Sequence, residues 1–97
     1  MRQIEFERFL VDSVDIKSKK KAVISRVAKA LKVERDLKVN LDSIVSDDEK
    51  TYKLLLQIRE QMNELNGVYQ NSVRKYYLFV NGKEFPRITS YEKNKAY

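Results

Sequence analysis

One stretch of the chain, residues 17–38, concentrates the side chains that could bind an anion. It holds nine Lys or Arg residues and two acids, against 20 basic and 14 acidic residues in all 97. Each Lys or Arg that meets a phosphate neutralises it and releases counterions, so this stretch predicts contact with a polyanion. The alternative interpretation is a solvated helix face. The candidate contacts here are Lys19, Lys20, Lys21, Arg26, Lys29 and Lys32.

A second basic segment, residues 67–97, carries six basic and two acidic residues. Within it Arg74 and Lys75 adjoin Tyr76 and Tyr77. Basic residues interleaved with aromatic ones can hold phosphates and stack on bases. The helical spacing of the tyrosines nevertheless favours the protein core for their rings. We therefore predict Arg74 and Lys75 as phosphate contacts.

The residue types needed for most catalytic and metal chemistry are missing. The chain has no His and no Cys, so the common nucleophile–base pairs and thiolate or imidazole metal sites are excluded. Three adjacent acids, Asp47, Asp48 and Glu49, follow Ser46 in the S-x-x-E pattern of a helix capping box, which accounts for them. We expect no catalytic activity, no metal and no cofactor.

The elements that must position these residues are predicted to be helices. Two Gly and one Pro leave few turn formers. Apolar periodicity predicts helices over residues 3–11, 19–37, 46–65 and 69–80, with one helical turn possible in the connector 39–45. The expected fold is all-α, a compact bundle of four to five short helices. Residues 1–88 would form one domain and residues 89–97 a polar, frayed tail.

The helix over residues 19–37 has the clearest apolar stripe. Ile24, Val27, Ala28 and Leu31 share one face, which predicts that they point into the core. Lys19, Arg26 and Lys29 would then project outward, with Lys32 on one flank. Lysines also crowd the start of this helix, where the helix dipole disfavours positive charge. That placement favours a binding role for the cluster.

Three segments, "VISRVAKALKVERDL", "DEKTYKLLLQI" and "NSVRKYYLFVNGK", give the chain a family resemblance. Over about residues 5–85 it resembles the SAM-like helical domain at the N-terminus of phage integrases and other tyrosine recombinases. Similar modules precede restriction-type nuclease domains. The resemblance implies a mobile-element module that clamps duplex DNA through backbone contacts. The contacts it implies are Lys19, Lys20, Arg26 and Lys29 on the second helix and Arg74 and Lys75 on the last. Lys21 and Ser25 stand where the family has a Thr and an aromatic residue.

Two functions remain open from the sequence. The first is a non-enzymatic domain that binds duplex DNA, which requires the two basic segments to meet on one surface. The second is a protein-interaction module that does not bind nucleic acid, a mobile-element adaptor or an inhibitor, whose partner is an acidic protein surface or a second copy of the chain. It would be favoured if Leu54, Leu56 and Phe79 formed an exposed apolar patch. A third possibility is a structural fragment whose activity needs a further domain. No stretch is long enough and apolar enough for a membrane span, so we expect a cytoplasmic protein without a membrane partner.

Overall fold

The computed structural model describes residues 1–12, 19–62 and 67–95. These residues form the helices α1 (Gln3–Asp12), α2 (Lys19–Leu37), α3 (Leu41–Val45), α4 (Asp48–Gln61), α5 (Val68–Asn81) and α6 (Ile88–Lys95). The prediction of an all-α bundle is confirmed. The four predicted helices correspond to α1, α2, α4 and α5, and α3 is the turn allowed for in the connector.

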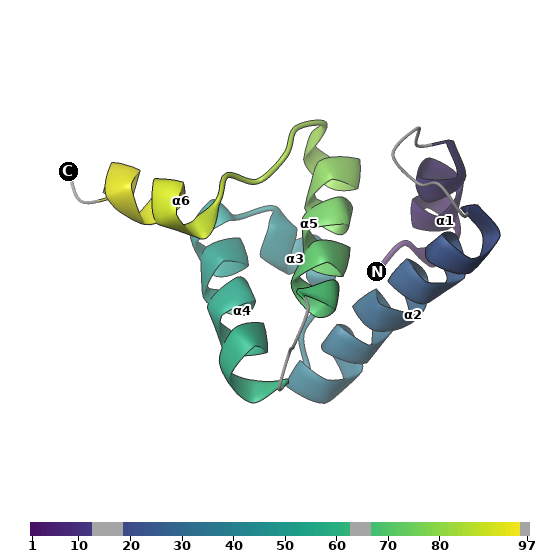
Figure 1. The fold of residues 1–97 in the computed structure, drawn as a ribbon, viewed down its shortest axis with the longest axis horizontal. Coiled ribbons are helices and arrows are strands. Elements are labelled where there is room, and N and C mark those ends of the chain that lie inside the picture. Colours follow the sequence, from purple (N-terminus) through teal and green to yellow (C-terminus); the bar gives the residue numbers. More distant parts are fainter. Residues whose placement is uncertain (13–18, 63–66, 96–97) are drawn as a thin grey trace.

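Helix α5 is the centre of the bundle. It packs against α1, α2, α3 and α4, and α1 packs in turn against α2. Figure 1 shows α5 between α2 on one side and α4 on the other, with α1 beyond the start of α2. Two segments far apart in the sequence, α2 and α5, therefore lie side by side.

The core is built around aromatic side chains of α5. Tyr76 and Tyr77 are buried, and the ring of Phe6 meets that of Tyr76 edge-on at 5.0 Å. Leu55 and Ile58 of α4 are fully buried in the same core. The expectation that the tyrosine rings belong to the core is confirmed, so these rings are not available to stack on bases.

The apolar stripe predicted for α2 is partly wrong. Val27 is buried as expected, but Ile24 is 59% exposed and Ala28 is exposed. The buried positions of α2 are Val23, Val27, Ala30 and Val33. Because α2 packs against both α1 and α5, its smaller side chains face inward, where they let the neighbouring helices approach closely. Helix α2 is thus rotated about its axis relative to the prediction. As a result Arg26, a surface neighbour of Val23 and Ala30 on the helix, lies at the edge of the core.

The start of α4 also differs from the prediction by one residue. Asp47, not Ser46, is the N-cap, and its Oδ1 accepts a hydrogen bond from the Lys50 amide at 3.1 Å. Ser46 ends α3 instead, where its hydroxyl donates to the Ser43 carbonyl at 2.7 Å. Because α3 ends directly before α4, Ser46 caps the C-terminus of α3. The N-cap of α4 is therefore the next residue whose side chain can accept a hydrogen bond, Asp47. Ser18 and Leu65, also predicted near helix ends, lie outside the described residues.

The segment predicted as a polar tail contains α6, whose described residues are helical rather than frayed. Tyr91 anchors it: its ring lies 4.9 Å from that of Tyr52 and 5.3 Å from that of Phe85. The Tyr91 hydroxyl donates to Oε2 of Glu49 at 2.9 Å. One aromatic residue in two helical turns gives no periodic signal, so only packing against α4 reveals this helix.

Candidate nucleic-acid interface

Two adjoining hollows lie along the seam between α2 and α5. The larger, about 310 Å³, is lined by Arg26, Asn71, Arg74, Lys75, Leu78, Glu84 and Phe85. The smaller, about 100 Å³, is lined by Ser25, Arg26, Lys29, Val68, Asn71 and Ser72. Arg26 and Asn71 border both hollows, and we call the whole surface the α2–α5 groove. It joins the two basic segments that the sequence analysis singled out.

Arg26 has a polar atom that the described part of the protein does not satisfy. Its Nε is buried and has no hydrogen-bond partner there. A buried donor left unpaired costs roughly 1–3 kcal/mol, and more when the group is charged. The donor lies on a side chain that lines both hollows.

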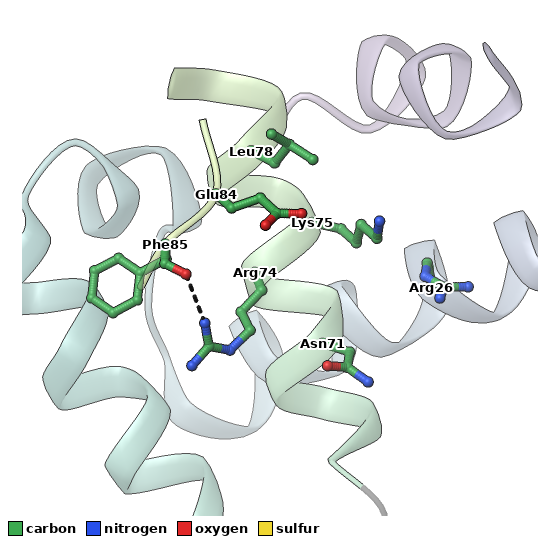
Figure 2. Close-up of a pocket in the computed structure, with 7 residues that line it drawn as sticks. All are labelled: Arg26, Asn71, Arg74, Lys75, Leu78, Glu84 and Phe85. Carbon is green, nitrogen blue, oxygen red and sulfur yellow. Dashed lines mark hydrogen bonds between the residues drawn. The ribbon is translucent and has the colours of Figure 1, made fainter. Parts of the chain in front are cut away.

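Arg74 is fixed in the opposite wall. Its Nη1 donates to the carbonyl oxygens of Phe85 at 3.0 Å and of Pro86 at 3.1 Å, and its guanidinium lies 5.8 Å from the Phe85 ring centre. Burial lowers the pKa of Arg74, and the nearby charge of Glu84 partly opposes that effect. Figure 2 shows the guanidinium turned toward the segment that follows α5. The side chain is thus held in place by backbone carbonyls.

Two lysines complete the cationic lining. Lys29 donates through Nζ to the Ser25 hydroxyl, one turn earlier on α2. Lys75 extends from α5 toward the side of the groove where Arg26 lies (Figure 2). The groove therefore has four cationic side chains and one carboxylate, Glu84. This excess of positive charge is the electrostatic property that anion binding requires.

Three other predicted contacts, Lys20, Lys21 and Lys32, do not line the groove. Lys20 and Lys21 are exposed at the start of α2. Lys32 forms an ion pair with Asp36, with 2.7 Å between Nζ and Oδ2. Lys19 begins α2, but its side chain lies outside the described part of the structure. Of the eight predicted residues, the structure brings together Arg26, Lys29, Arg74 and Lys75.

The sequence did not reveal the groups that hold these cations. The carbonyls of Phe85 and Pro86 fix Arg74, and Glu84 contributes the single acid. The available signal was the helix stop at Asn81–Gly82 followed by Pro86, which indicates that the chain turns after α5. Gly82 does take the left-handed conformation, with φ of 74°.

The apolar patch considered for a protein partner is not formed by the residues named for it. Leu54 is 2% exposed and Leu56 is half-buried. Phe79 is half-buried, with its ring centre 5.8 Å from that of Phe6 and 5.5 Å from that of Phe9. Within the described ranges, the large apolar residues that are exposed are Ile4, Val11, Ile24 and Val68.

Tyrosine hydroxyls bind four acidic side chains that do not line the groove. Tyr77 donates to Asp48 at 2.7 Å, Tyr52 to Glu92 at 2.9 Å and Tyr91 to Glu49 at 2.9 Å, and Tyr76 donates to Asp42. We call these four pairs the carboxylate–tyrosine contacts. Burial, followed by the carboxylate acceptor, raises the pKa of Tyr76, Tyr77 and Tyr91 to about 12. These hydroxyls satisfy the carboxylates without neutralising their charge.

Comparison with protein-family models, with curated proteins and with solved structures finds no match for this chain. The function must therefore be argued from the groove itself. Among residues 1–12, 19–62 and 67–95, no three acidic side chains are grouped so that they could hold a metal ion. None of the helices in those ranges combines the length and hydrophobicity that crossing a bilayer demands.

Proposed function

We propose that this chain is a non-enzymatic DNA-binding domain that holds duplex DNA through phosphate contacts in the α2–α5 groove. One observation carries the proposal. Arg26 and Lys29 of α2 line the same groove as Arg74 and Lys75 of α5, and a single carboxylate lies among them. Four cations kept close together gain from a ligand that brings several negative charges, as a phosphate backbone does.

The chemistry of the two arginines suits phosphate in particular. A guanidinium presents several N–H donors in a plane and can bind two phosphate oxygens at once. Arg26 carries a buried donor without a partner in the described residues. Arg74 uses Nη1 for backbone carbonyls, which leaves its other donors for a ligand. Lys29 and Lys75 add charge on flexible side chains.

These contacts position a duplex rather than read its sequence. Phosphate contacts fix the orientation of a protein on DNA and carry no direct sequence information. Tyr76 and Tyr77, which could have stacked on bases, are buried. Asn71 borders both hollows, and its amide is suited to phosphate oxygens as well as to base edges. We therefore expect similar affinity for unrelated sequences.

We favour the SAM-like module of tyrosine recombinases as the family to which this chain is related. This relationship is supported by the all-helical fold and by a groove formed between a basic helix and a later helix, α2 and α5. A cytoplasmic role in a mobile element, acting on DNA without a cofactor, fits the same proposal.

The test is titration of the protein against random-sequence duplex DNA at several salt concentrations. For contacts to four phosphates we expect a slope of log affinity against log salt of about −3 to −4. Arg26→Glu/Lys29→Glu should reduce affinity roughly 30-fold or more, because each change removes an attraction and adds a repulsion.

Lys50→Glu/Lys53→Glu is the matched control, since it changes net charge equally at exposed positions of α4 that do not line the groove. It should reduce affinity about threefold or less, because only long-range attraction is lost. Equal losses in the two double variants, or no binding at low salt, would contradict the proposal.

A further inference from the structure

The outward face of α1 has no partner in the described structure. Phe6 and Leu10 bury the inner face completely, whereas Ile4 is 65% exposed and Val11 is 45% exposed. A shallow hollow on the surface of α1 is lined by Ile4, Glu7, Arg8 and Val11, and by Asp12 at the end of the helix. The first four are spaced by three, four and seven residues, which places them on one helical stripe. We call this stripe, residues 4, 7, 8 and 11, the α1 face.

The α1 face reads the same in both directions: apolar, charged, charged, apolar. Ile4 and Val11 are equally distant from the midpoint between Glu7 and Arg8. We propose that a second copy of this chain docks on the α1 face, with the two α1 helices antiparallel about a two-fold axis at that midpoint. Ile4 of each copy then lies opposite Val11 of the other, and Glu7 lies opposite Arg8.

Charge complementarity selects the second copy as the occupant. Neither Glu7 nor Arg8 forms an ion pair with another residue in the described ranges. An antiparallel pairing gives each of them an opposite charge, twice per dimer, because a two-fold interface repeats every contact. A parallel pairing would set Glu7 against Glu7 and Arg8 against Arg8, which is repulsive.

Helix α2 extends the same surface. Ile24, Ala28 and Leu31 line a hollow of about 220 Å³ together with Glu7 and Gln3 of α1. Glu7 borders both this hollow and the one on the α1 face, so the two are neighbours on the surface. A docked second copy would therefore cover Ile24, which is 59% exposed. Burial of these apolar side chains is the driving force we assign to the dimer.

The proposed dimer leaves the α2–α5 groove accessible. Residues two apart on a helix are separated by about 200° around its axis. Ile24 and Ala28 each lie two residues from Arg26, so they occupy the opposite flank of α2. Dimer formation and DNA binding are thus separate properties, and failure of one leaves the other standing.

Disulfide formation tests the register, because the chain has no Cys of its own. Under mild oxidation we expect Ile4→Cys/Val11→Cys to give a covalent dimer and each single variant to remain monomeric. In the antiparallel pairing, two copies of the same position lie about 10 Å apart along the axis, beyond the reach of a disulfide. The same separation prevents a bond between positions 4 and 11 within one chain.

Charge exchange tests the central pair by sedimentation equilibrium. Glu7→Lys or Arg8→Glu alone should raise the dimer dissociation constant roughly tenfold or more, since each places two like-charge pairs at the centre. The combination Glu7→Arg/Arg8→Glu should restore it. Glu5→Lys, an exposed change on α1 outside the face, is the control and should have little effect.

Three results would overturn the inference. The first is a wild-type chain that stays monomeric up to roughly 1 mM, the weak limit of association. The second is cross-linking of the single variants as readily as the double one, which would indicate a parallel or random encounter. The third is a charge exchange that fails to rescue the dimer while circular dichroism shows every variant folded.

Discussion

The α2–α5 groove contains mainly cationic side chains, whereas the carboxylate–tyrosine contacts contain acidic ones. In the groove, arginine and lysine side chains are held by a hydroxyl and by backbone carbonyls, as with Lys29 on Ser25 and Arg74 on Phe85. In the carboxylate–tyrosine contacts, acids are held by neutral phenols, as with Asp48 on Tyr77. Lys29, Arg74 and Asp48 thus have hydrogen-bond partners that carry no charge.

The difference shows how a small domain can stay folded and still present a charged surface. Had Asp48 of α4 paired with Arg26 or Arg74, both charges would be neutralised and anion binding would cost the fold an ion pair. Ion pairs among the described residues include Lys32 with Asp36 and, at one of the four carboxylate–tyrosine contacts, Arg2 with Asp42. We infer that the tyrosine contacts contribute to the stability of the fold.

Of the changes we consider, alkaline pH should have the largest effect on stability, because it ionises the tyrosines of the carboxylate–tyrosine contacts. The fold raises the pKa of Tyr76, Tyr77 and Tyr91 from 10.0 to about 12, so it favours the protonated phenols. Their contribution to stability is complete below pH 10 and is lost as the pH rises toward 12.

Thermal unfolding followed by circular dichroism should show this decline in melting temperature, and ultraviolet absorbance should show that these phenols ionise late. A melting temperature that is constant from pH 9 to about 12 would contradict the role given to the tyrosines.

Tyr76→Phe should give an intermediate effect. The hydroxyl donates to Asp42 and accepts from the Arg2 amide at 2.8 Å, and the side chain is fully buried. Its loss leaves a carboxylate with one partner fewer, which should lower the free energy of unfolding by about 1–2 kcal/mol. Tyr69→Phe is the control, because Tyr69 is only half-buried. Chemical denaturation that gives the two variants equal stability would remove the distinction between core and surface tyrosines.

Arg26→Met should have the smallest effect on stability. It also distinguishes a role of Arg26 in stability from a role in DNA binding. The change removes a buried donor without a described partner but keeps an unbranched, apolar side-chain stem. We expect the free energy of unfolding to stay constant or rise by up to about 1 kcal/mol. Affinity for duplex DNA should fall about three- to tenfold. A clear loss of stability on chemical denaturation would show that Arg26 supports the fold rather than a ligand.

The sequence predicted the main helices because their ends and periodicity are local properties. The start of α5 near Gly67 and its end at Gly82 follow from residues that adopt left-handed conformations easily. The burial of Tyr76 and Tyr77 followed from helical spacing alone. By contrast, α6 depends on Tyr91 meeting Tyr52, and a contact between residues so distant leaves no periodic signal.

The candidate site was predictable in composition but not in geometry. Arg26, Lys29, Arg74 and Lys75 were identifiable as basic residues on two helices. Their convergence depends on α2 packing against α5, which no local pattern encodes. The orientation of α2 could not be fixed either, because apolar residues cover a broad arc of this helix. The structure buries Val23, whereas the sequence favoured the larger Ile24.

The two hydrogen bonds from Arg74 to backbone carbonyl oxygens have an entropic consequence. A free arginine must give up many rotamers to hold a ligand, at a cost of about 0.5–1.5 kcal/mol. In Arg74 the hydrogen bonds to the carbonyls of Phe85 and Pro86 already restrict the rotamers in the free protein, so ligand binding loses less side-chain entropy. A lysine at this position would restore the lost freedom and weaken the grip even though the charge is unchanged.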